Sequence, residues 1–251
     1  MPPRYGTQDR TTAGTKGVVG RGKAKSGGRY VAPEPPSARR RQPKVPAHLD
    51  EEMRSAAGAE RAPRLAARLA QASKAYERDR YEEARQILRT LAQEAPASAS
   101  VRELYGLTLY RISRWREALR QFKAFHDLTG AYDQHPAMED CHRALRQWPS
   151  VDRLWEELRE ASPSAELVTE GRIVAAESRA DRGDVAGAIR MLEPSARKIT
   201  QPKEHHLRLW YALADLYERA GELPAARDLF GRILRQDRAF FDAAERLSSL
   251  G

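Results

Sequence analysis

The sequence predicts an all-α protein: an α-solenoid of about five helical hairpins with a C-terminal capping helix, preceded by a disordered tail. Small residues occur in pairs twelve positions apart, as at Gly106 and Ala118, which places one on each helix of a hairpin. Ala84 and Ala118 are 34 residues apart, so the pairs also repeat with a fixed period. Such a period is typical of stacked helical repeats. An ordinary helical bundle is the alternative, but its packing does not require small and large residues to recur in register.

The first two hairpins are predicted from their paired small residues. Ala72 and Ala84 mark the first hairpin, and Gly106 and Ala118 mark the second. Phe122 follows Ala118 by four positions, so the two side chains share one face of a helix. We therefore expect the two helices of each hairpin to cross closely at the small residues.

The third hairpin lacks this signature and is predicted from prolines and apolar spacing. Pro136 suits a first helical position, and the helix is expected to run to Trp148 before Pro149 breaks it. A second helix is expected to end at Pro163. Its buried stripe is predicted to consist of Val151, Leu154, Trp155 and Leu158.

The fourth and fifth hairpins again have small residues twelve positions apart. Ala176 and Ala188 mark the fourth, and Ala214 and Ala226 mark the fifth. The interval from Ala188 to Ala226 is 38 residues, and Pro202 explains the longer connection because proline prevents helix continuation. A closing helix is predicted from Phe240, Phe241, Ala244 and Leu247. It would cover the apolar end of the stack.

The fifth hairpin also carries a known motif. Six of its residues reproduce the W-x2-L-G-x2-Y and A-x3-F patterns, with Ala in place of Gly: Trp210, Leu213, Ala214, Tyr217, Ala226 and Phe230. Residues 63 to 240 therefore resemble the tetratricopeptide repeat family. This resemblance implies a curved surface that binds other polypeptides, with no catalytic role.

The resemblance also implies that the first helix of each hairpin lines a concave groove. The acids in that register are Glu77, Glu103, Glu170, Glu177, Asp181, Asp215 and Glu218, and the bases are Arg111, Arg208 and Arg219. This composition predicts an acidic groove, although some of these carboxylates could simply solvate exposed helix faces. The residues expected to contact a partner are Tyr110, Arg111, Glu177, Asp181, Tyr211 and Asp215. Leu69 and Ser73 replace the Lys and Asn of the family's peptide-carboxylate clamp, so binding of an acidic C-terminal peptide is not expected.

Residues 1–49 differ in composition from the predicted solenoid at residues 50–251. They contain seven glycines, no Phe and no Trp, so we expect them to be disordered. Eleven Lys and Arg against Asp9 and Glu34 give this tail the whole net charge of +9. The tail is either a solubilising linker or an arm for an anionic partner such as RNA or DNA. Contacts with such a partner are expected from Arg29, Arg39, Arg40, Arg41 and Lys44.

Two patterns in the sequence suggest a phosphate-binding loop and a metal site, but neighbouring residues argue against both. Residues 17–24 match the spacing of a phosphate-binding loop, but Ala24 lacks the hydroxyl that would bind magnesium, and no strand precedes the loop. His135, Glu139 and His142 share one helical face, but no fourth metal ligand accompanies them. We therefore expect neither a cofactor nor a metal ion.

These observations rank three classes of function. A non-catalytic adapter that binds a protein or peptide is favoured, a nucleic-acid or ribosome-associated protein acting through the tail is second, and an enzyme is a distant third. Cys141 is the single cysteine, which favours a reducing compartment. The sequence shows neither a signal peptide nor a long apolar segment, so we expect a cytoplasmic protein without membrane partners.

Overall fold

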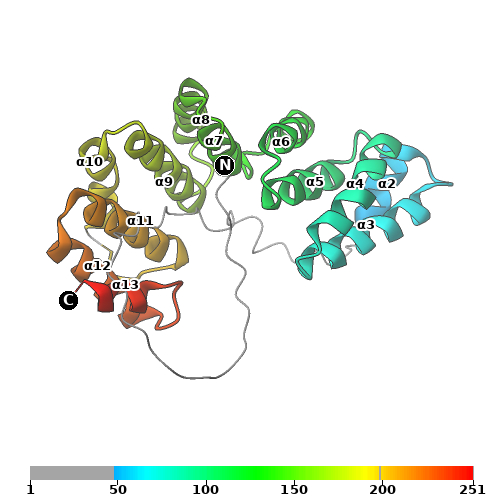
Figure 1. The fold of residues 1–251 in the computed structure, drawn as a ribbon. Helices are drawn as coiled ribbons and strands as arrows, with labels where there is room; N and C mark the ends of the chain where they lie inside the picture. The colour runs from blue at the N-terminus through cyan, green and yellow to red at the C-terminus, as the bar shows by residue number, and fades with distance from the viewer. Residues whose placement is uncertain (1–47, 198, 251) are drawn as a thin grey trace, which may run out of the picture.

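The computed structural model describes residues 48–197 and 199–250, and this part of the chain consists of α-helices joined by turns and loops, without strands (Figure 1). The predicted tail residues Arg29, Arg39, Arg40, Arg41 and Lys44, and the loop at 17–24, lie outside it. The helices run in the order α2 (His48–Ala57), α3 (Ala62–Glu77), α4 (Tyr81–Glu94), α5 (Ala99–Arg111), α6 (Trp115–Thr129) and α7 (His135–Ala144). They continue with α8 (Trp148–Ala161), α9 (Ala165–Asp181), α10 (Val185–Ala196), α11 (Glu204–Ala220), α12 (Leu223–Gln236) and α13 (Ala243–Ser249).

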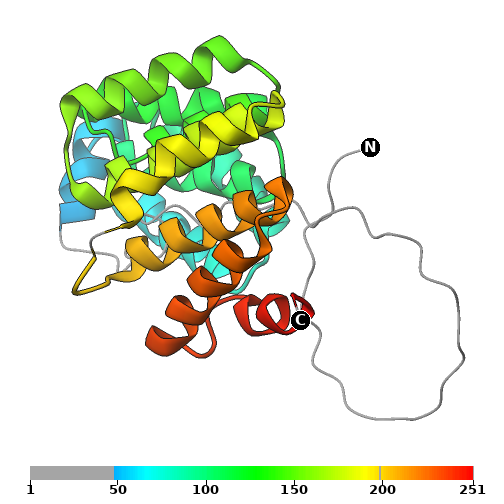
Figure 2. The ribbon, with the colours of Figure 1, turned by 90° about the vertical axis from the view of Figure 1, so that its left-hand side faces the viewer.

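Helices α3 to α12 form the predicted hairpins, which follow one another along an arch. Figure 1 shows α5, α9 and α11 on the inner side of the arch and α6, α8 and α10 on its outer side. In the turned view of Figure 2, α13 lies at the end of the stack, next to α12. This arrangement confirms the predicted α-solenoid with a C-terminal capping helix.

The small residues lie where the helices of a hairpin touch. Ala84, Ala118 and Ala226 are fully buried. A Cβ atom placed on Gly106 of α5 would lie 2.5 Å from the ring of Phe122 on α6. Glycine is therefore required here for the helices to approach, and the predicted register of the second hairpin is confirmed.

The third hairpin differs from its predicted boundaries. Helix α7 ends at Ala144, and the backbone turns at Arg146, which has a φ of 57°. Trp148 and Pro149 belong to the start of α8 rather than to the end of α7. Proline is tolerated in a first turn because the N–H that it lacks has no partner within the helix there.

The two ends of the stack also differ from expectation. Helix α2 was not predicted, yet Met53 on it is fully buried against the first hairpin. At the other end, α13 begins only at Ala243, so Phe240 and Phe241 precede the closing helix. Its buried small residue is Ala243, whereas Ala244 is exposed.

Apolar side chains form two clusters of buried residues. One extends from α2 to α8 and the other from α9 to α13. Helices α7 and α8 both pack against α9, so the third hairpin joins the two parts of the stack. None of the described helices has the length and apolar character needed to cross a bilayer.

Candidate functional site

The residues predicted to contact a partner lie on three inner helices of the arch. Tyr110 and Arg111 end α5, Glu177 and Asp181 lie on α9, and Tyr211 and Asp215 lie on α11. The structure brings the carboxylates of α9 and α11 together around Arg219, which also belongs to α11.

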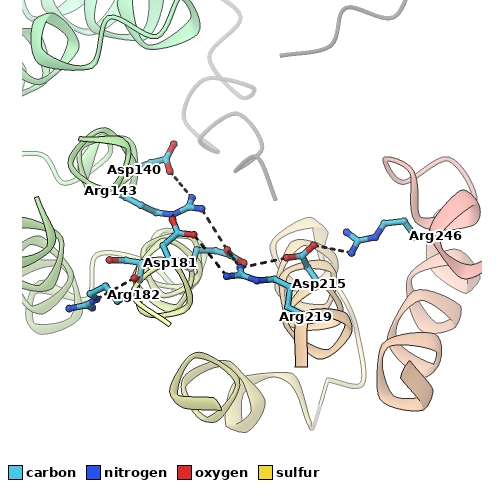
Figure 3. Close-up of polar contacts among 9 residues, drawn as sticks. Asp140, Arg143, Asp181, Arg182, Asp215, Arg219 and Arg246 are labelled. Atoms are coloured by element: carbon cyan, nitrogen blue, oxygen red, sulfur yellow. Dashed lines mark hydrogen bonds and ion pairs between the residues drawn. The ribbon is translucent and has the colours of Figure 1, made fainter. Parts of the chain in front are cut away.

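These groups belong to a longer array, which we call the inner-face ion-pair chain. It consists of Asp140, Arg143, Glu177, Asp181, Asp215, Arg219 and Arg246 (Figure 3). Positive and negative groups alternate along it from α7 through α9 and α11 to α13. Ion pairs between side chains thus connect α7 of the third hairpin, the fourth and fifth hairpins, and the capping helix.

Arg143 forms the end of the chain on α7. Its Nη1 donates to Asp140 Oδ1 at 3.0 Å, and its Nε donates to Asp181 Oδ2 at 2.9 Å. Its Nη2 lies 3.7 Å from Oε2 of Glu177. The hydroxyl of Tyr110 donates to the other oxygen of Asp140 at 2.7 Å, which extends the network to α5.

Two arginines continue the chain on α11 and α13. Arg219 Nη1 donates to Glu177 Oε2 at 3.1 Å and lies 3.9 Å from Asp215 Oδ2. Arg246 Nη2 donates to Asp215 Oδ1 at 2.9 Å and also contacts Glu218. The guanidinium of Arg246 stacks over the ring of Tyr211, 5.4 Å from its centroid. The capping helix is therefore held by charge and aromatic contacts as well as by apolar ones.

The members of the chain differ in their access to solvent. The side chains of Glu177 and Asp215 are 0% and 2% exposed. Those of Asp181 and Arg219 are 15% and 31% exposed, so these two groups form part of the accessible surface. Tyr110 and Tyr211 are buried. Of the predicted partner contacts, Asp181 is therefore better placed to meet a ligand than Glu177.

Burial and crowding change the protonation of Glu177. Burial is the main cause that raises the pKa of this carboxyl to about 7, and the nearby carboxylates of Asp215 and Asp181 act in the same direction. The guanidinium groups of Arg143 and Arg219 oppose this rise. Glu177 consequently titrates near neutral pH.

A second buried ion pair repeats the arrangement two turns earlier on α9. Arg208 of α11 donates to Glu170 at 3.0 Å and to Glu204 at 2.6 Å. Burial raises the pKa of Glu170 to about 7, against the opposing effect of Arg208. Two acids seven residues apart on α9 thus each face an arginine of α11.

The acid-rich inner face that the sequence predicted is extensively paired with arginine. Two of the arginines, Arg143 and Arg246, were not among the predicted site residues. Arg143 lies in the hairpin that lacks the repeat signature, and Arg246 lies in the capping helix. The i,i+3 spacing of Asp140 and Arg143 was the only local signal for this contact. Arg111 lies apart from the chain, stacked on the ring of Tyr81 at 5.0 Å.

The α7 residues considered as metal ligands have different environments. His135 and Glu139 are buried, whereas His142 is partly exposed and contacts Gln147. Within residues 48–197 and 199–250, no group of three or more His, Cys, Asp or Glu side chains is arranged to hold a metal ion. Neither carboxylate oxygen of Glu139 has a hydrogen-bond partner among the described residues.

Comparisons with known proteins identify the fold. No protein-family model matches the sequence, and no curated protein matches it. The structure is similar to the crystal structure of a thermophilic TPR protein from Thermus thermophilus, with a TM-score of 0.58 and 17% sequence identity. The match covers 74% of this chain and 98% of that one. It shows that this chain has a tetratricopeptide-type fold.

Proposed function

We propose that this chain, with its tetratricopeptide-type fold, is a non-catalytic adapter that binds a partner polypeptide on the inner face of the arch. The observation that carries the proposal is the inner-face ion-pair chain, which crosses successive hairpins on the side that repeat proteins of this type present to their ligands. Asp181 and Arg219 offer a partly exposed acceptor and donor along it. An extended peptide could pair with several such groups in succession.

The single cysteine is not suited to act as a nucleophile. Cys141 is fully buried, and burial raises the pKa of its thiol well above the ordinary value. A reactive cysteine needs a stabilised thiolate, which is the opposite condition. The same residue supports our proposal of a cytoplasmic location, because a chain with one cysteine forms no internal disulfide.

Site-specific photo-crosslinking in cells tests the adapter function. A photoreactive amino acid is placed in the full chain at Asp181 or Glu218 on the inner side. Matched controls carry it at Lys123 of α6 and Glu156 of α8, which are well exposed on the outer helices. We expect a discrete cross-linked polypeptide from the inner positions only. Equal cross-linking from the outer positions would overturn the proposal.

A nucleic-acid function through residues 1–49 is the second candidate, and the net charge of +9 in this segment favours it. Binding would be electrostatic and would weaken steeply with salt. Replacing Arg39, Arg40 and Arg41 by Gln should then reduce the affinity for RNA and the slope of its salt dependence. An affinity for RNA that those substitutions leave unchanged would exclude this role for the arginine cluster.

A further inference from the structure

Glu139 lies at the joint between the two clusters of buried residues. We use joint for the contact of α7 and α8 with α9. Ala137 and Cys141 of α7 belong to the first cluster, and Ile173 of α9 belongs to the second. Glu139 is fully buried between them, and a Cβ atom placed on Gly171 of α9 would lie 2.9 Å from its Oε1. The absence of a side chain at Gly171 therefore makes room for a carboxyl group in the joint.

The surroundings of this carboxyl group are apolar. The same Cβ atom would also meet Leu158 and Trp155 of α8, so Glu139 shares this space with two large apolar side chains. Neither of its oxygens accepts a hydrogen bond from a described residue. A buried carboxylate without such partners is costly, so the neutral acid is favoured. Burial accordingly raises the pKa of Glu139 well above its ordinary value of 4.5.

The charged groups around the joint do not neutralise Glu139. The carboxylate of Asp140, which adjoins it on α7, also favours the protonated form. The other ionisable groups of the helices packed here have partners of their own: His135 with His126 of α6 and Glu157 of α8, Asp140 with Tyr110 of α5, Arg143 with Asp181 of α9, Asp152 of α8 with Arg182 of α9, Glu170 with Arg208 of α11, and Arg172 with Ser195 of α10.

We propose that the contact between α8 and α9 opens with hydration of Glu139 and release of its proton, so that protonation of this one residue holds the arch closed. In the open joint water solvates the carboxylate, and its pKa returns to about 4.5. The closed joint thus binds one more proton than the open one between that pH and the raised pKa. The ratio of open to closed protein should therefore increase about tenfold for each pH unit in this range. The ion pair of Arg143 with Asp181 lies on the inner side and serves as the pivot, so that opening changes the curvature of the arch.

Ser178 of α9 is a suitable position for measuring this opening. It is fully buried and lies seven residues after Gly171, on the same face of the helix. Arg182, one turn further along this face, pairs with Asp152 of α8 at 2.9 Å, which shows that the face contacts α8. The thiol introduced by Ser178→Cys should therefore react with a labelling reagent only when the joint opens. Cys141 is fully buried in the first cluster and reports the unfolding of that cluster in the same molecule.

The experiment measures thiol labelling of the full-length Ser178→Cys protein above about pH 6.5, where most histidines are neutral. Three backgrounds are compared: Glu139 unchanged, Glu139→Gln, and the control Glu156→Gln on the exposed face of α8. Each labelling rate is divided by the rate of the same thiol in urea-unfolded protein, which removes the effect of pH on thiol reactivity. The ratio gives an opening constant for each thiol. Val174→Cys, also buried on α9, is the second probe if Ser178→Cys disturbs the fold.

With Glu139 present, the opening constant of the introduced thiol should exceed that of Cys141 and increase about tenfold per pH unit. Glu139→Gln should remove this increase, and Glu156→Gln should preserve it. An opening constant that does not depend on pH would overturn the link to a proton, and a pH dependence that survives Glu139→Gln would overturn its assignment to Glu139. Equal constants for the introduced thiol and Cys141 would mean that only global unfolding exposes the joint, which overturns the local opening.

Discussion

Arg219 of α11 donates a hydrogen bond to the fully buried Glu177 of α9, with 3.1 Å between Nη1 and Oε2. The same carboxylate oxygen lies 3.7 Å from Arg143 of α7. One buried carboxylate thus contacts arginines from the helices on either side of its own. Since a buried charge without a counter-charge is costly, packing between these hairpins depends on charge pairing as well as on apolar contact.

Arg143→Ala should destabilise the protein strongly, because it removes the counter-charge of Asp140 and Asp181 as well as that of Glu177. Breaking a buried ion pair by removing one partner costs roughly 3–5 kcal/mol. Arg182→Ala is the matched control: this arginine pairs with Asp152, which is 53% exposed, so its loss should cost about 0–1 kcal/mol. Urea denaturation measures both, and comparable small losses would show that the inner-face ion-pair chain adds little to stability.

Gly106→Ala should destabilise the second hairpin. The added Cβ would lie 2.5 Å from two ring atoms of Phe122, which are themselves held in the core. Overpacking of this kind costs roughly 1–3 kcal/mol. Gly231→Ala on α12 is the control, since its Cβ would meet nothing closer than 3.6 Å and alanine favours the helix. The reverse order of the two free energies of unfolding would contradict the close crossing of α5 and α6.

Met53→Ala should test whether α2 belongs to the folded domain. Met53 is fully buried, and Glu52 beside it accepts hydrogen bonds from Ser98 and Ser100 at the start of α5. Truncating a buried methionine costs roughly 2–5 kcal/mol. Thermal and urea unfolding of this variant can be compared with Ser55→Ala, an exposed position on the same helix. Equal stability of the two variants would mean that α2 does not contribute to the fold.

Glu139→Gln should change how stability depends on pH. Burial, with a smaller effect from Asp140, raises the pKa of Glu139 well above 4.5. The folded protein then keeps a proton that the unfolded chain has lost. The contribution of Glu139 to wild-type stability should therefore decrease as pH rises above about 4.5, by about 1.4 kcal/mol per pH unit, until the folded pKa is reached.

Glutamine preserves the shape of the protonated acid without titrating. The free energy of unfolding of Glu139→Gln should accordingly increase, relative to that of the wild type, as pH increases. Glu156→Gln serves as a control because this side chain is 54% exposed on α8. Parallel pH profiles for the wild type and Glu139→Gln would show that the carboxyl is ionised in the folded protein.

Most of the fold could be predicted from the sequence, because it depends on local spacing. Paired small residues such as Gly106 and Ala118 lie on facing helices, and a larger side chain at either position would push the two helices apart. The boundaries near Pro149 were wrong because proline is compatible with the first turn of one helix as well as with the end of another. Helix α2 was missed because its burial depends on contacts with distant parts of the chain, including Ser98.

The sequence by itself determined the helical register, and with it the helices that carry Glu177, Asp181 and Asp215. Only the tertiary structure decided which arginines meet these acids. Arg143 and Arg219 approach Glu177 from positions 34 and 42 residues away in the chain. Ion pairing at such separations depends on how the hairpins stack. A helical period predicts only the face of its own helix on which a side chain lies. For that reason the acidic composition of the inner face could be read from the sequence, whereas its pairing, burial and protonation could not.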